Sequence, residues 1–168
     1  LVLHSAQGNS PRVDSLLEEL RRNLNDLDRI GQMLDEEIVL NSRADIELTG
    51  FAPTESSAAN QWRWALGGRQ TIAFQSPCRK NYFNYKFQIP CASTKITIRF
   101  AEEVIQEIVS QKDQEIVQGS FCIEASTAAP AQTLQIDCSS WNQGKQRFCD
   151  DQRPLAYSVL QFNLFSES

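Results

Sequence analysis

The chain has 168 residues, a hydrophobic fraction of 41 % and a formal net charge of −5, which suits one domain with a real core and not two. Its 16 Lys and Arg residues are scattered, and because nucleic-acid binding needs clustered positive charge, we expect no nucleic-acid partner. No run of 18 apolar residues occurs, so a membrane is expected to be reached only through a segment that this sequence does not contain.

The first predicted element is a long amphipathic helix. Residues 1–9 are interpreted as a frayed leader, after which Ser10 and Pro11 supply an N-cap and a first-turn proline. Apolar residues then follow a 4-3 spacing on one helix face: Val13, Leu17, Leu20, Leu24, Leu27, Leu34 and Ile38. This spacing predicts a helix over 10–40, and we assign Leu17, Leu20, Leu24 and Leu27 to its assembly face.

The rest of the chain is predicted to be an irregular loop followed by a β-rich head. Residues 41–68 are rich in Gly, Pro, Ser and Ala and are interpreted as a long loop, with a possible short strand at 44–48 and a strand starting near Trp62. In 69–168, apolar and polar residues alternate in segments such as 85–89, 96–100 and 160–164, which predicts an antiparallel sheet of five or six strands. For 101–111 a short helix is favoured over a strand. The predicted fold class is α+β.

Five cysteines favour disulfide bonds over zinc ligation, because the sequence has no CxxC pair and only one histidine, His4. Two local loops offer pairings, Cys78 with Cys91 and Cys138 with Cys149. Buried thiols at all five positions are the alternative. Disulfides would place the protein outside the cell, on its surface or in the periplasm.

Catalytic motifs are missing from the sequence. His4, in the predicted leader, is a poor base for nucleophilic catalysis, and no nucleotide-binding or zinc-protease motif is present. We therefore expect neither an enzyme nor a cofactor or metal site. Aromatic residues in or beside loops are the candidate partner-binding residues, because exposed rings stack on sugars or anchor proteins: Trp62, Trp64, Tyr82 and Trp141.

The order of these features resembles the soluble part of type IV pilins and of type II secretion pseudopilins. The matching parts are the helix over 10–40, the αβ-loop over 41–68, the loop between Cys138 and Cys149, and the segment 121–125 (FCIEA), which is similar to the CxEA strands of some pilins. The processed hydrophobic N-terminus of that family is not in this sequence. The resemblance implies a helix packed on the sheet, a disulfide-closed C-terminal loop, and a non-catalytic, adhesive subunit of an exported filament or secretion assembly.

Two alternatives remain open at this stage. Read as heptads, the N-terminal stripe also fits an oligomeric coiled coil that carries a β-sandwich head. Leu16, Ile30 and Met33 widen the stripe, which favours packing on a sheet of the same chain. The second alternative, a carbohydrate- or peptide-binding module, depends on the loop aromatics alone. The expected partners are accordingly other assembly subunits, with a surface receptor or a glycan as further candidates.

Overall fold

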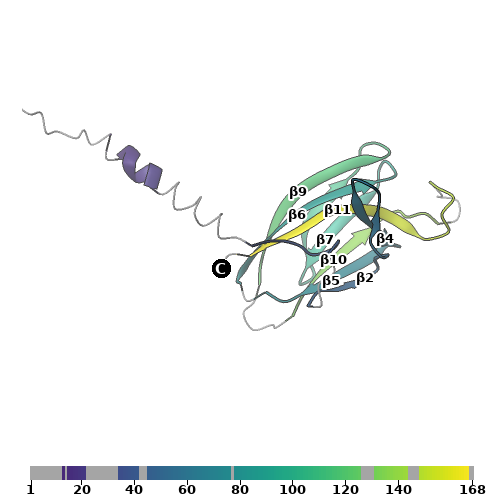
Figure 1. Cartoon of the computed structure of the whole chain (residues 1–168), viewed down its shortest axis with the longest axis horizontal. Coiled ribbons are helices and arrows are strands. Elements are labelled where there is room, and N and C mark those ends of the chain that lie inside the picture. Colours follow the sequence, from purple (N-terminus) through teal and green to yellow (C-terminus); the bar gives the residue numbers. More distant parts are fainter. Residues whose placement is uncertain are drawn as a thin grey trace, which may run out of the picture.

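The computed structural model describes residues 13, 15–21, 34–41, 45–76, 78–125, 131–143 and 148–166. From residue 34 onward, the described residues form a sandwich of two antiparallel β-sheets (Figure 1). The strands assigned within them are β1 Leu34–Glu37, β2 Glu47–Thr49, β3 Glu55–Ser56, β4 Gln61–Leu66, β5 Arg69–Phe74, β6 Lys80–Ile89, β7 Lys95–Phe100, β8 Glu103–Val109, β9 Glu115–Glu124, β10 Gln132–Cys138 and β11 Leu155–Ser166. One sheet has the order β3-β4-β11-β6-β9, with β1 also paired to β11, and the other has the order β2-β5-β10-β7-β8.

Strict alternation of side chains explains why these segments form a sandwich. In β6 every second residue is buried: Asn81, Phe83, Tyr85, Phe87 and Ile89. The other residues of β6 face outward, and β10 has the same pattern, with Leu134 and Ile136 fully buried. Because successive strand residues point to opposite faces, each sheet gives one apolar face to the core and one polar face to solvent.

Aromatic rings and one buried hydrogen bond join the two sheets. Phe83 of β6 stacks on Phe121 of β9 with ring centroids 5.0 Å apart, and meets Phe74 of β5 edge to face at 5.4 Å. The hydroxyl of Tyr157 on β11 donates to Oε1 of Gln70 on β5 over 3.1 Å, and both residues are fully buried. This bond satisfies polar groups that would otherwise be costly between two sheets.

The long N-terminal helix is a wrong prediction. Helical conformation is assigned to residues 13 and 15–21 of the described chain, whereas Leu34–Glu37 forms β1, antiparallel to β11. Ile38 and Val39 follow as fully buried core residues, and the Glu37 carboxylate accepts hydrogen bonds from the backbone N–H groups of Val39, Leu40 and Phe162. A few apolar residues fit the helical period and the strand period equally well. Here the backbone pairing with β11 makes residues 34–37 a strand. Residues 1–9 and 22–33 lie outside the described residues.

Two further predictions of local structure are corrected. Residues 103–109, favoured as helix, form β8, whose pairing with β7 shifts register between Ile98 and Arg99. This irregularity breaks the alternation that identifies a strand. The predicted loop over 41–68 contains three strands: β2 and β4 correspond to the strands expected at 44–48 and near Trp62, whereas β3 was not expected.

The disulfide-closed loop is also absent. All five cysteines lie among the described residues, and Cys91, Cys138 and Cys149 are thiols, so neither the Cys138–Cys149 nor the Cys78–Cys91 bridge is present. Cys138 lies on the core face of β10, where its thiol donates to the Ser140 carbonyl over 3.1 Å. Burial raises the pKa of this thiol to about 11. Cys138 therefore behaves as a small core residue.

These corrections exclude the pilin-like layout. In that layout a helix covers one sheet, whereas here a second sheet takes that position. The α+β class is replaced by an all-β sandwich with a short helical segment near its N-terminal end. No helix in the described residues is long and apolar enough to cross a membrane.

Candidate functional site

The outer face of the β1-containing sheet carries a groove of about 1080 Å³. Its polar and aromatic floor residues come from three neighbouring strands: Trp62 and Trp64 of β4, Gln161 and the 2 % exposed Ser158 of β11, and Lys86 and Gln88 of β6. Apolar side chains line it too, among them Leu160 of β11 and Ile116 of β9. Ser158 pairs with both Trp64 and Gln88, and Gln161 pairs with Lys86. The sheet register therefore sets aromatic, amide, hydroxyl and ammonium groups side by side.

Alternation in β4 directs both tryptophans into the groove. Between them, Arg63 points to the other side, where its Nε and Nη2 donate to Thr54 Oγ1 over 3.2 and 2.8 Å. Trp64 stacks on Phe148 from the loop before β11, with centroids 6.4 Å apart and planes inclined by 28°. Both tryptophans are half-buried. Part of each ring packs against the protein, and part of it is exposed to the groove.

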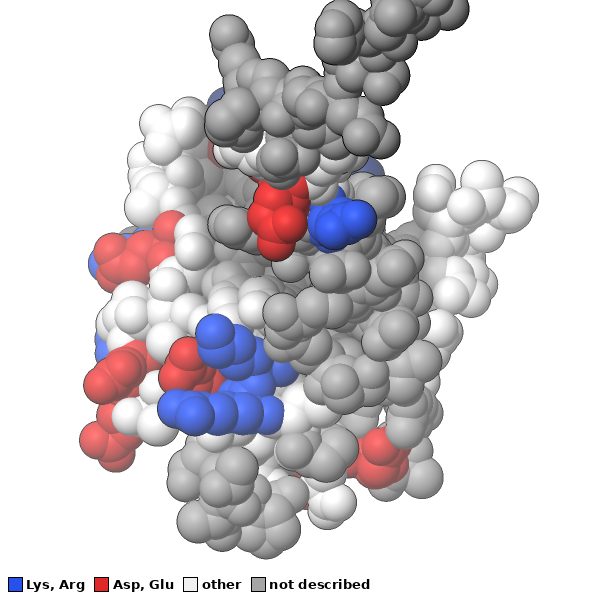
Figure 2. Space-filling view, turned by 90° about the vertical axis from the view of Figure 1, so that its left-hand side faces the viewer, with Lys and Arg blue, Asp and Glu red and all other residues white. Residues whose placement is uncertain are grey.

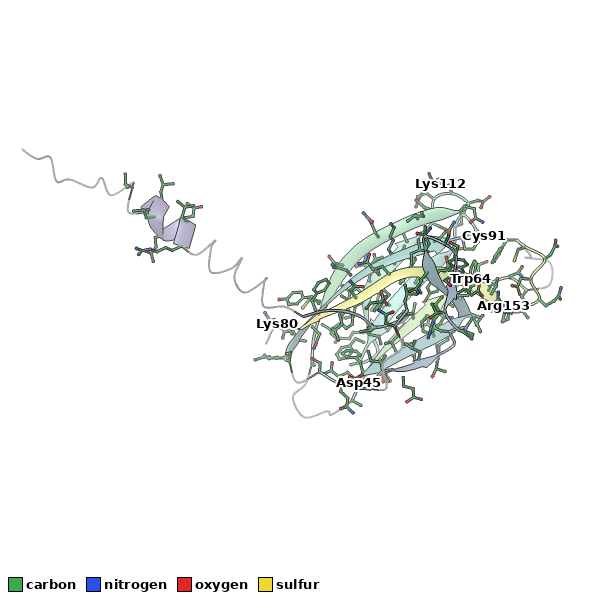
Figure 3. All side chains as sticks on the ribbon, viewed as in Figure 1. Asp45, Trp64, Lys80, Cys91, Lys112 and Arg153 are labelled. Carbon is green, nitrogen blue, oxygen red and sulfur yellow. The ribbon has the colours of Figure 1, made fainter. Side chains whose placement is uncertain are left out.

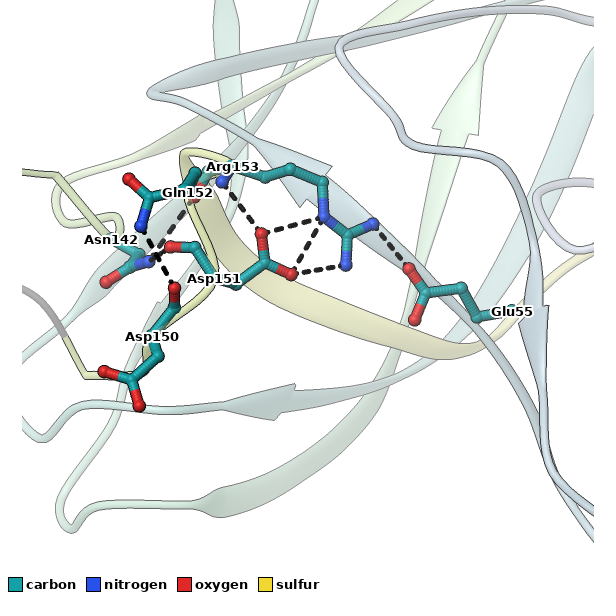
Figure 4. Close-up of polar contacts among 6 residues, drawn as sticks. All are labelled: Glu55, Asn142, Asp150, Asp151, Gln152 and Arg153. Atoms are coloured by element: carbon teal, nitrogen blue, oxygen red, sulfur yellow. Dashed lines mark hydrogen bonds and ion pairs between the residues drawn. The ribbon is translucent and has the colours of Figure 1, made fainter.

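One wall of the groove is held by an ion-pair cluster around Arg153 (Figure 4). The guanidinium contacts Asp151 through Nη2 at 2.6 Å and Nε at 3.0 Å, and Glu55 of β3 through Nη1 at 2.5 Å. Hydrogen bonds from Arg153 hold the pKa of Asp151 below its ordinary value. The cluster links the loop before β11 to the edge strand β3. All three nitrogens of the Arg153 guanidinium donate hydrogen bonds within it.

Asn142 fixes the backbone of the same loop. This side chain is 4 % exposed; its amide donates to the Asp151 carbonyl over 2.7 Å, and its Oδ1 accepts from the Phe148 N–H over 3.0 Å. The Asn142 backbone N–H donates to the Leu155 carbonyl over 2.6 Å. A buried amide with its partners satisfied makes a rigid support, so the groove wall is built into the fold.

Lys86 is the cation of the groove floor. Among the described residues it forms no ion pair, in contrast to Lys80, which lies 3.8 Å from Glu124, and Lys95, which pairs with Glu107. Elsewhere the charges are mixed: on the face shown in Figure 2, Lys and Arg side chains lie beside Asp and Glu side chains.

The structure separates the four predicted partner-binding aromatics. Trp62 and Trp64 line the groove. Tyr82 lies on the same face of β6 but outside the groove lining. Trp141 is half-buried and packs against the core, with its ring over Gly68.

Sequence reasoning missed Lys86, Gln88, Gln161 and Arg153. Their sequence signal is weak, because polar residues that alternate with core residues are ordinary on a half-buried strand. Only the pairing of β4, β11 and β6 brings these residues together. In the described residues, no group of three His, Cys, Asp or Glu side chains is placed to hold a metal ion.

No family model matches the sequence, and none of the curated proteins is similar to it. Among solved structures, the C-terminal family 6 carbohydrate-binding module of a laminarinase from Zobellia galactanivorans is 9 % identical, with 79 % of this chain and 98 % of that chain covered and a TM-score of 0.45. A family 35 module from Clostridium thermocellum is 6 % identical, with 80 % and 98 % covered and a TM-score of 0.47. A family 6 module from Clostridium cellulolyticum in complex with xylose is 12 % identical, with 80 % and 97 % covered and a TM-score of 0.45. What those modules bind belongs to them, and the function of this chain has to be inferred from its own groove.

Proposed function

We propose that this chain is a non-catalytic carbohydrate-binding domain that holds a glycan in the groove over β4, β11 and β6. The observation that carries the proposal is the pair Trp62 and Trp64, which point from one strand into a groove that also holds the polar side chains Lys86, Gln88 and Gln161. A pyranose ring has C–H groups on its faces and hydroxyls around its rim, so it needs an aromatic surface and hydrogen-bonding side chains together.

The amide side chains in the groove support a hydroxyl-rich ligand. Gln161 offers an amide that donates and accepts hydrogen bonds, and Gln88 offers a second amide, whose nitrogen also donates to Gln114 Oε1 over 3.2 Å. The groove is open and extends across strands β4, β11 and β6. This shape suits a chain of sugar units better than a small enclosed metabolite. The glycan partner and the carbohydrate-binding alternative of the sequence analysis are thereby retained, and the filament-subunit reading is not.

The fixed wall supports binding without a large conformational cost. Arg153, Asp151 and Glu55 hold one another, and Asn142 fixes the intervening backbone. A site whose side chains are already positioned loses little entropy when a ligand binds. We expect the groove to keep its shape on binding.

Binding of soluble polysaccharides tests the proposal. The probes are xylan, laminarin and hydroxyethyl cellulose in affinity electrophoresis, followed by calorimetry with xylotriose and cellotriose, the ligands of two structurally similar modules. We expect at least one polysaccharide to retard the migration of the protein. We also expect Trp62→Ala and Trp64→Ala each to weaken binding at least about tenfold, because a few central aromatic residues carry most of the binding energy of an interface.

Tyr82→Ala is the matched control, because it removes an aromatic from the same sheet face outside the groove. We expect this variant to bind as the unchanged protein does, and all three variants to keep their strand signal in circular dichroism. Equal loss in Tyr82→Ala and Trp64→Ala would contradict the groove assignment. Capture of extended peptides with no retardation by any polysaccharide would contradict a glycan ligand.

A further inference from the structure

The helical residues carry an apolar stripe that the described sandwich does not cover. Val13, Leu16, Leu17 and Leu20 are 44 %, 54 %, 46 % and 57 % exposed. Their spacing of three and four residues puts all of them on one helix face. A helix this short is marginally stable in water without a packing partner. We therefore expect its exposed apolar side chains to pack against another surface.

The charges beside the stripe favour protein over lipid. Glu18 and Glu19 are exposed on the same helical turns, and Arg21 is the cation among the described helical residues. Helices that lie on anionic membranes need a face rich in Lys and Arg, whereas among the described helical residues the two glutamates outnumber Arg21. A 4-3 repeat of leucines is instead the pattern that packs against the same repeat on another helix, and in the sequence Leu24 and Leu27 continue the spacing.

We propose that the helical segment self-associates through Val13, Leu17 and Leu20, so that the chain forms a homo-oligomer held at its helical end. The occupant of the stripe is the same stripe on another copy of this chain. Leu16 lies beside the seam and extends the apolar contact.

The groove is placed so that it stays open in such an oligomer. The helical segment reaches the sandwich through β1, which starts opposite Ser166 at the C-terminal end of β11. Trp64 pairs with Ser158, so the groove lies about 26 Å along an extended strand from that point. Figure 3 shows Trp64 and Arg153 at one end of the sandwich and Lys80 at the other.

Multivalent glycan binding is the functional consequence, and this part rests on the proposed function. Two or more grooves on one oligomer bind a repeating polysaccharide with an avidity well above the affinity of one groove, provided that the grooves reach the same chain. The self-association itself requires no glycan.

Sedimentation equilibrium of the whole chain, without glycan, tests the self-association from about 5 to 500 µM. We expect the mean mass to rise with concentration above the 19.0 kDa of one chain. The double variant Leu17→Glu, Leu20→Glu is expected to shift the association midpoint at least about tenfold upward, because it puts charge into the apolar seam. The control Glu18→Gln, Glu19→Gln keeps the seam and is expected to associate as the unchanged chain does.

Three outcomes would overturn the proposal. The first is a mass of one chain at every concentration. The second is association that the double leucine variant leaves unchanged. The third is a monomeric chain that pellets with vesicles of phosphatidylcholine and phosphatidylserine, because the stripe would then bind a membrane.

Since Leu17 and Leu20 lie outside the sandwich, the melting temperature of the double variant should match that of the unchanged chain. The sedimentation results do not depend on glycan binding. The self-association proposal and the carbohydrate-binding proposal can therefore be contradicted independently of each other.

Discussion

At the residue scale, Asp137 shows how one carboxylate joins three strands of the second sheet. Its oxygens accept hydrogen bonds from Arg69 Nε at 2.8 Å, Arg99 Nε at 3.3 Å and Gln135 Nε2 at 2.8 Å. Burial alone would raise the pKa of Asp137, but these hydrogen bonds outweigh it, and the pKa lies below its ordinary value. The charged form is therefore favoured by folding.

A carboxyl group whose pKa is lower in the folded state stabilises the protein above its unfolded pKa, and this contribution is lost as pH falls through the folded pKa. We expect Asp137→Asn to lower the free energy of unfolding by about 1 kcal/mol at pH 7, since both arginines are partly exposed and solvent screens them. The difference from the unchanged protein should shrink below pH of about 4. Urea unfolding at several pH values measures it, and a difference that stays constant with pH would contradict the ion-pair account.

At the scale of elements, the segment between β10 and β11 combines a supporting half with a binding half. Trp141 packs on the core edge, and a Cβ built on Gly68 would lie 2.8 Å from its ring. Phe148 and Arg153 instead serve the groove, one under Trp64 and the other in the wall. The sequence analysis expected this segment to be a disulfide-closed loop that presents Trp141 to a partner, and it did not foresee this division.

This division predicts that Trp141→Ala lowers the free energy of unfolding by about 2 kcal/mol, because a half-buried ring loses its packing and leaves a cavity. The sequence-based interpretation of Trp141 as a partner-binding loop residue predicts the opposite, with folding nearly intact and binding lost. Thermal unfolding and polysaccharide retardation of the same variant decide between them. In parallel, Gly68→Ala should destabilise the fold through the clash with the ring, and an unchanged melting temperature in both variants would show that this contact is unimportant.

At the scale of the whole molecule, stability comes from the core between the sheets. Cys138 is buried there as a thiol, and Cys91 and Cys149 are half-buried thiols, one just after β6 and the other in the segment between β10 and β11. Nothing in these contacts requires an oxidised state. An exported location, which the sequence analysis inferred from disulfides, remains a prediction without that support.

We therefore expect a reducing agent to leave the melting temperature unchanged within about 1 °C, since removing a stabilising disulfide from a small domain costs 2 kcal/mol or more, which corresponds to several degrees. Differential scanning fluorimetry with and without dithiothreitol measures this. The control is the same pair of scans on a secreted protein with known disulfides. A fall of several degrees in this chain would contradict the thiol state of its cysteines.

The sequence by itself determined several strands of the head. Strict alternation in 85–89, 96–100 and 160–164 predicted strands that the structure confirms in β6, β7 and β11, because period two is a local consequence of pleating. A strand starting near Trp62 was also predicted and is confirmed as β4, whereas the outward orientation of both Trp62 and Trp64 was not predicted. The apolar 4-3 stripe at Leu17 and Leu20 was also visible, and its self-association stays a proposal.

Only the tertiary structure decided how the pieces combine. Leu34–Glu37 becomes a strand because β11 offers it backbone partners, and residues 103–109 become a strand although their register shift hides the alternation. The groove exists because β4, β11 and β6, distant in sequence, are neighbours in one sheet, which brings Lys86, Gln88 and Ser158 beside the tryptophans. Strand pairing depends on long-range hydrogen bonds and on a shared core, and neither is encoded in any local window of residues.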